Sequence, residues 1–162
     1  MSAVAGAWYA IIDCAQDPRL LPLVKQCSER ECLYAGDLNP DLEATAPWIV
    51  RINDRDPLLS TWQTHGRGLN WGIMCEATLQ MADLRRHFRK FLQAKLPDGM
   101  IVLFRFFDPR VFNTYIRALA PDERAPWFQN ILQYAVEGAD PQVMHQYRMS
   151  KGSLVDGHDV IG

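Results

Sequence analysis

Four short runs of β-branched and aromatic residues, separated by stretches with helical spacing, are the feature that most limits how this chain can fold. The runs cover residues 8–13, 48–52, 70–75 and 101–107. Short runs of this composition are typical of strands. Strands that alternate with helices favour an α/β fold, in which helices flank one sheet. We therefore expect a single domain built on a mixed, mostly parallel sheet of four to five short strands.

The clearest helical pattern runs from Met81 to Leu92. Its apolar residues recur at helical spacing and form one stripe, whereas its basic residues lie off that stripe. We expect the apolar side to pack on the sheet, which leaves the basic side to solvent or to a partner protein. The stripe consists of Met81, Leu84, Phe88, Phe91 and Leu92, and the basic residues are Arg85, Arg86, Arg89 and Lys90.

A turn signal follows this helix. Pro97-Asp98-Gly99 has Pro where a type I turn favours it and Gly after it. We therefore expect residues 94–96 to pair with residues 101–106 as a hairpin. This antiparallel pair is the reason why the predicted sheet is mixed rather than purely parallel.

The dipeptide Asp-Pro occurs four times, each time before an apolar stretch with helical spacing. Asp is a favoured N-cap and Pro a favoured first helical residue, because the N–H that Pro lacks would be unpaired there. We expect Asp108 to cap a helix that runs to about Leu119. The first copy predicts a helix start nearer Leu21, because Pro22 would break a helix begun at Pro18. The four copies begin at Asp17, Asp56, Asp108 and Asp140.

Arg105 lies inside the aromatic run of residues 104–107. A buried guanidinium without a partner is strongly destabilising, so this side chain must pair with a carboxylate or leave the sheet at its edge. Asp13, Glu76 and Asp108 are the candidate carboxylates. A structural ion pair is one interpretation. The other is that Arg105 binds an acceptor-rich partner, since arginine offers several donors suited to carboxylates and carbonyls.

His87 lies on the basic helix, beside the apolar stripe. It could pack against the sheet, or it could act as a general base with Asp108 or Glu76 in a small hydrolase or transferase. The sequence contains no metalloprotease, nucleophile-elbow, P-loop or dinucleotide-binding motif. This favours a binding protein over an enzyme.

Composition argues against several classes of protein. The chain has 162 residues and a formal net charge of −2, which does not suit nucleic-acid binding. Its four cysteines form no CxxC pair and have no histidine at zinc-ligand spacing, so we expect reduced thiols, no metal and no cofactor. The apolar residues 3–12 are too few to span a membrane and follow no basic residue, so we expect a cytoplasmic protein without a signal peptide.

Three blocks carry a resemblance to a known family. They are Trp71-Gly72-Ile73, the helix LRRHFRKFL and the segment LPDGMIVLFRFFDPRVF. The flanking segments YAIIDCAQDPRLLPLVK and LYAGDLNPDLEATAPWIVRI extend the similarity over roughly residues 9–119. In these residues the chain resembles the adaptor, or chaperone, family of bacterial type VI secretion effectors, long catalogued as a domain of unknown function.

The resemblance implies a cytoplasmic, non-enzymatic protein that binds one toxic effector and assists its loading onto the secretion spike. The implied partners are the cognate effector and, as a further candidate, the spike tip protein (the valine-glycine repeat protein), with no nucleic acid and no membrane. It also implies an α/β lobe that a helical lobe often follows. We expect the α/β domain at residues 8–135, and only a short helical segment with a flexible tail at residues 136–162.

The resemblance marks His87, Arg89, Arg105, Asp108 and Arg110 as signature residues, with Arg85 and Trp71 nearby, and all seven are candidates for partner binding. Residues 85–110 contain seven basic and two acidic residues, whereas residues 29–56 contain seven acidic and three basic ones, so one face should be electropositive. We expect the basic helix and the joint capped by Asp108 to form an electropositive, partly aromatic cleft for a segment of the effector. The sequence leaves open whether these side chains hold the fold or the partner. They are Trp71, Arg85, His87, Arg89, Arg105, Asp108 and Arg110.

Overall fold

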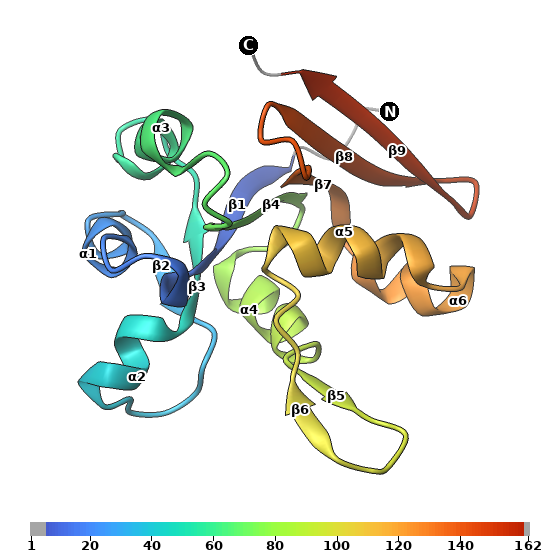
Figure 1. The fold of residues 1–162 in the computed structure, drawn as a ribbon, viewed down its shortest axis with the longest axis horizontal. Helices are drawn as coiled ribbons and strands as arrows, with labels where there is room; N and C mark the ends of the chain where they lie inside the picture. Colours follow the sequence, from blue (N-terminus) through green and yellow to red (C-terminus); the bar gives the residue numbers. More distant parts are fainter. Residues whose placement is uncertain (1–5, 161–162) are drawn as a thin grey trace.

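A computed structural model describes residues 6–160 and contains nine strands among them. Seven strands form one sheet in which every neighbouring pair is antiparallel, and the fifth and sixth form a separate antiparallel pair. The strands are β1 (Ala7–Asp13), β2 (Arg30–Cys32), β3 (Pro47–Arg51), β4 (Gly72–Ala77), β5 (Gln93–Lys95), β6 (Ile101–Leu103), β7 (Ile131–Glu137), β8 (Val143–Ser150) and β9 (Ser153–Val160). The order in the large sheet is β2-β3-β1-β4-β7-β8-β9 (Figure 1).

Short helices cover both faces of the large sheet. The helices are α1 (Leu20–Lys25), α2 (Pro40–Thr45), α3 (Leu58–Thr61), α4 (Met81–Arg89), α5 (Pro109–Ala118) and α6 (Pro121–Arg124), with shorter helical turns η1 (Cys14–Gln16), η2 (Trp62–Gly66) and η3 (Ala125–Phe128). α1 and α3 pack on one face of β1 and β3, whereas α4 and α5 pack on the other face of the sheet (Figure 1). The result is a three-layered arrangement with the sheet in the middle.

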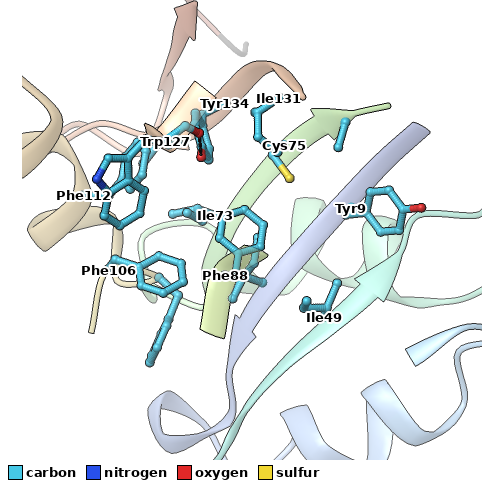
Figure 2. Packing of buried hydrophobic residues seen from close by; sticks show 14 of the residues in the cluster. Tyr9, Ile49, Ile73, Cys75, Phe88, Phe106, Phe112, Trp127, Ile131 and Tyr134 are labelled. Atoms are coloured by element: carbon cyan, nitrogen blue, oxygen red, sulfur yellow. Dashed lines mark hydrogen bonds between the residues drawn. The ribbon is translucent and has the colours of Figure 1, made fainter. Parts of the chain in front are cut away.

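Side-chain alternation along β1 divides the core in two. Tyr9 and Ile11 point into the core beneath α4 and α5, whereas Ala10 and Ile12 point into the core beneath α1 and α3. The first core is rich in aromatic rings, as Figure 2 shows. Its large buried rings include Phe88, Phe106, Phe112, Trp127 and Tyr134.

The prediction of a mixed, mostly parallel sheet is wrong, because all neighbouring strands in the large sheet are antiparallel. The alternation of strands and helices indicated parallel pairing. However, β3 inserts between β1 and β2 and runs antiparallel to both. The spacing of apolar residues does not encode the order of the strands.

The individual strands and helices agree with the prediction more closely than the sheet topology does. Three of the four predicted strands are confirmed as β1, β3 and β4, and the predicted helix is confirmed as α4. The hairpin around Gly99 is confirmed as β5–β6, but it does not join the large sheet. β6 ends at Leu103, because the chain then turns to bury Phe106 and Phe107 in the aromatic core.

Three of the four Asp-Pro dipeptides precede a helix, as predicted, but of the four aspartates only Asp108 is the N-cap. Asp108 occupies the N-cap of α5, and its carboxylate accepts a hydrogen bond from the backbone N–H of Arg110 at 2.9 Å. α1 begins at Leu20, next to the predicted start, since Pro18 lies in a turn before it.

Asp56 and Asp140 do not cap helices, and only the copy at Asp140 fails to precede one. Asp56 precedes α3 but accepts hydrogen bonds from the backbone N–H and hydroxyl of Ser28, at 3.0 and 2.9 Å, and so fixes a loop. Asp140 precedes β8 and closes a turn by accepting a hydrogen bond from the N–H of Gln142 at 3.0 Å. In both cases the carboxylate has a partner other than a helix N-terminus.

The last part of the described chain is a β-hairpin. We expected a helical segment and a flexible tail at residues 136–162, but residues 143–160 form β8 and β9, and residues 161–162 lie outside the described residues. Lys151 and Gly152 both have positive φ, at 51° and 78°, which suits a two-residue turn between twisted strands. Among residues 6–160, no helix is long and apolar enough to cross a bilayer.

Candidate functional site

The joint between β6 and α5 carries the charged residues that the sequence singled out. Phe106 and Phe107 are buried and anchor the joint, and Asp108 caps the helix that follows. Arg105 leaves this core and forms an ion pair with Asp13 at the end of β1. Asp13 was one of the three candidate carboxylates, so this pairing is confirmed. It ties the joint to the centre of the sheet.

The tripeptide Asp-Pro-Arg occurs twice, at residues 17–19 and 108–110, and both copies adopt the same local structure. Arg19 donates to the Asp17 carboxylate from its backbone N–H at 2.9 Å, from Nε at 3.0 Å and from Nη2 at 2.6 Å. Arg110 makes the same three hydrogen bonds to Asp108, at 2.9, 3.0 and 2.7 Å. Because the proline between them fixes φ, the arginine folds back on its own aspartate.

Each of these three pairs joins a buried carboxylate to a guanidinium group at the surface. The side chains of Asp13, Asp17 and Asp108 are 1%, 10% and 8% exposed. Their partners remain accessible, since the side chains of Arg105, Arg19 and Arg110 are 43%, 59% and 64% exposed. We call these three guanidinium groups the arginine surface.

Contacts through Trp71 and Asp13 connect the members of the arginine surface. The Arg19 guanidinium lies over the Trp71 ring, 5.6 Å from its centroid. The Trp71 carbonyl oxygen accepts a hydrogen bond from the N–H of Asp13 at 2.8 Å, and Asp13 holds Arg105. The third member follows directly along the chain, because only the buried turn from Phe106 to Pro109 separates Arg105 from Arg110.

The pairings within the two Asp-Pro-Arg tripeptides lower the pKa of their carboxylates. Hydrogen bonds from Arg19 lower the pKa of Asp17 to about 2. Burial raises the pKa of Asp108, but the hydrogen bonds and charge of Arg110, with the charge of Arg105, outweigh it and lower that pKa. Arg19 and Arg110 therefore each have a compensating negative charge beneath them. The arginine surface offers hydrogen-bond donors rather than a large net charge.

Arg19 and Asp17 were not predicted as site residues. The residues around Asp108 were singled out as a joint, and the four Asp-Pro dipeptides were interpreted only as helix starts. Comparing the residue after each proline would have separated the two copies with arginine from the other two. The repeat of the full tripeptide is therefore the sequence signal that identifies Arg19.

Trp71 lies inside the fold. Its side chain is buried, and Gly66 packs so closely on the ring that a Cβ there would lie 2.6 Å from it. Gly72 allows β4 to approach β1, since a Cβ at this position would lie 2.0 Å from the carbonyl oxygen of Ile11. Trp71 and Gly72 thus belong to the buried structure beneath Arg19, and the Trp71 side chain is not exposed to a partner.

Arg85 and Arg89 on α4 bind backbone carbonyl groups of this chain. Arg85 donates from Nε to the oxygen of Cys32 at 2.7 Å and from Nη2 to that of Tyr34 at 3.2 Å. Arg89 donates from Nη1 to the oxygen of Leu33 at 2.6 Å. These bonds fasten the segment after β2 to α4.

His87 is packed among aromatic rings. It is buried, and its ring centroid lies 5.0 Å from that of Phe88 and 5.2 Å from that of Phe91. Burial lowers the pKa of His87 to about 4, and the charge of Lys90 contributes. Its Nε2 has no hydrogen-bond partner among residues 6–160. A general base needs access to substrate and an orienting partner, and this environment offers neither.

The seven predicted partner-binding residues therefore fall into three groups. Arg105, Asp108 and Arg110 lie together at the joint. Arg85 and Arg89 line a separate surface hollow, while His87 and Trp71 are buried. Arg110 also borders a cleft of about 550 Å³ between α5 and the turn that links β7 to β8.

The cysteines are isolated thiols. All four are free, and burial raises the pKa of Cys14 to about 12 and that of Cys27 to about 11. In the part of the chain that the structure describes, no three His, Cys, Asp or Glu side chains come together as metal ligands.

The fold and the arginine surface together define a domain with a seven-stranded antiparallel sheet between helices and a preformed set of surface hydrogen-bond donors. Comparison with family models places the chain more specifically: the model described as Domain of unknown function (DUF4123) matches residues 8–126. The chain belongs to this family, which is associated with type VI secretion effectors. Neither the curated proteins nor the solved structures gave a match.

Proposed function

We propose that this protein is a cytoplasmic adaptor, or chaperone, that binds one type VI secretion effector and assists its loading onto the secretion spike. Family membership supports the link to effectors. The proposal assigns no catalytic step to this chain. The spike tip protein is a further candidate partner during loading.

The observation that carries this proposal is the arginine surface. Its three guanidinium groups are exposed, yet each is held by a carboxylate that is 10% exposed or less. An arginine side chain loses up to about 2 kcal/mol of rotamer entropy when it is ordered. Here folding has already fixed the arginines, so less of that cost falls on binding.

The remaining donors of these arginines suit carbonyl and carboxylate acceptors of a protein. Arg19 and Arg110 use Nε and Nη2 for their own aspartates, which leaves Nη1 to point elsewhere. Arg105 uses only Nη2 for Asp13. Guanidinium groups presented in fixed positions favour directional recognition over general charge attraction.

The first test is capture of the effector. The tagged protein is purified from cells that express the secretion system, co-purifying proteins are identified, and the complex is rebuilt from purified parts. We expect one large toxin-like protein at a stoichiometric ratio. If no protein is recovered from cells shown to be expressing the secretion system, the adaptor proposal fails.

The second test is a pair of double variants. Arg19→Gln with Arg110→Gln removes two members of the arginine surface, and we expect the Kd for the effector to rise roughly tenfold or more, as for truncation of interface arginines. Arg55→Gln with Arg148→Gln is the matched control, because both arginines are exposed elsewhere. Binding is measured by calorimetry and folding by the thermal midpoint. Equal Kd values for the two double variants would remove the arginine surface from the proposed site.

A further inference from the structure

The β5–β6 hairpin is the most apolar exposed part of the described chain. Seven large apolar side chains are exposed among residues 6–160, and four of them lie within this one hairpin. Figure 1 shows the hairpin projecting from the body of the molecule, away from the large sheet. The four side chains are Leu96, Met100, Ile101 and Leu103.

One face of this hairpin has no cover among residues 6–160. Ala94 pairs with Val102, and both are half-buried, so this face leans on the body of the protein. Ile101 and Leu103 point to the opposite face and are 63% and 48% exposed. A two-stranded sheet alone in water is at best marginally stable. An exposed apolar face on such a sheet therefore indicates a site that binds another protein.

This face continues into the arginine surface. Along the chain, Ile101, Leu103 and Arg105 are exposed, whereas Val102 and Phe104 between them are half-buried. The hairpin is fastened at this end by a hydrogen bond from the N–H of Phe104 to the carbonyl oxygen of Leu92, at 2.7 Å. A protein that contacts Arg105 therefore lies next to the apolar face.

The size and charge of the hairpin identify the kind of occupant. A stable interface needs roughly 800 Å² from each partner, and four partly exposed side chains supply only a fraction of that area. The hairpin therefore cannot hold a dimer by itself, but it can project into a larger partner that also contacts the body. Lys95 lies opposite Ile101 in the hairpin, and Lys90 is exposed near its base. The acidic residue of the hairpin, Asp98, lies at its tip, where it accepts a hydrogen bond from the N–H of Met100 at 2.9 Å. The part of a partner that surrounds the base of the hairpin should therefore be acidic.

We propose that the β5–β6 hairpin inserts into an apolar, acid-rimmed groove on the effector. This inference rests on the proposed function, because it takes the effector as the occupant. The hairpin contributes apolar contact, and the adjacent arginine surface contributes directional hydrogen bonds.

The test uses the full chain and the effector identified by the capture experiment. Ile101→Ser with Leu103→Ser removes the apolar face, and Leu69→Ser with Leu132→Ser is the matched control, since those leucines are 43% and 41% exposed elsewhere. We expect the hairpin variant to raise the Kd roughly tenfold or more, and the control to change it less than about twofold. The thermal midpoints of both variants should stay close to that of the wild type.

Hydrogen exchange provides an independent readout. In the complex, the backbone amides of residues 93–103 should exchange more slowly than in the free protein. Suppose that the wild type and the hairpin variant bind the effector equally well, and that the amides of residues 93–103 in the wild type gain no protection in the complex. The hairpin inference then fails, whereas the adaptor proposal stands. If the wild type does not bind the effector, both fail. Concentration-dependent dimers that disappear in the hairpin variant would assign the face to a second copy and would also overturn the inference.

Discussion

At residues 17 and 108, a carboxylate is almost fully buried while its arginine partner stays at the surface. Burying a charge is unfavourable unless it is paired and hydrogen-bonded, and both carboxylates meet that condition within their own tripeptides. Each arginine thereby gains a fixed position. A lysine in place of Arg19 or Arg110 could not reproduce the paired Nε and Nη2 hydrogen bonds, because it has one ammonium group on a flexible side chain.

His87 makes the stability of the core depend on pH. Burial lowers its pKa from 6.5 to about 4 in the folded state. Between those values the unfolded chain binds more protons than the folded chain, so this contribution to stability falls as the pH falls from about 6.5 to about 4. We expect His87→Leu to abolish this contribution, because leucine cannot be protonated.

The measurement is the free energy of unfolding in urea at pH 7 and at pH 4.5. On lowering the pH from 7 to 4.5, the wild type should lose roughly 2 kcal/mol more of its free energy of unfolding than the variant does, after allowance for solvent screening. His65→Leu serves as the control, since His65 is exposed. The same movement in both variants would show that His87 is not responsible.

Among the elements, α5 is joined to the sheet by a buried polar network as well as by apolar packing. Asn113 donates from Nδ2 to the carbonyl oxygen of Glu137 on β7, at 2.7 Å. The hydroxyl of Tyr147 on β8 donates to Asn113 Oδ1 at 2.6 Å. One helical side chain thus contacts two neighbouring strands and fixes the position of the helix that begins at Asp108.

Removal of this network should destabilise the whole domain. Asn113→Ala leaves a buried carbonyl and a buried hydroxyl without their partner, and we expect a loss of about 2–3 kcal/mol in the free energy of unfolding. Thr114→Ala, at an exposed neighbouring position, should change it by about 0.5 kcal/mol or less. Urea titration of both variants checks this. A loss below about 1 kcal/mol at Asn113 would mean that water replaces both bonds.

The elements also show what the sequence could and could not predict. β1, β3 and β4 were predictable, because they are buried on both faces and contain continuous apolar runs. β8 and β9 were missed, because one of their faces is polar and their charged residues obscure the alternation. Sheet direction was predicted wrongly, since apolar spacing records which residues are buried but not which strands become neighbours.

The same limit applies to the site. The pairing of Arg105 with Asp13 was among the three options that the sequence left open, because an aromatic strand cannot bury an unpaired guanidinium. Arg19 was missed, since it is linked to Arg105 only by a chain of contacts through Trp71 and Asp13. Arg85 and Arg89 contact backbone oxygens, and backbone acceptors leave no pattern in a sequence.

At the scale of the whole molecule, the structure predicts a gradient of local stability. β1 and β4 lie at the centre of the large sheet between two helical layers, whereas β5–β6 is a separate pair attached at one end. Amides in a buried sheet exchange only through global unfolding, whereas those in isolated hairpins exchange through local opening. We expect the slowest exchange in β1 and β4 and fast exchange in β5–β6 of the free protein, measured by mass spectrometry. Equal protection in both regions would contradict this gradient.

The outer position of β9 has a consequence for behaviour at high concentration. β9 is eight residues long and lies at the end of the sheet, so it presents a long row of backbone donors and acceptors. Such an edge invites other chains to add strand by strand, as in amyloid. Asp156 on this strand is paired with Arg117 at 3.0 Å, but Asp159 has no basic partner among residues 6–160, so two β9 edges that approached each other would bring Asp159 carboxylates together. Repulsion between like charges therefore protects the edge against self-templated fibril growth.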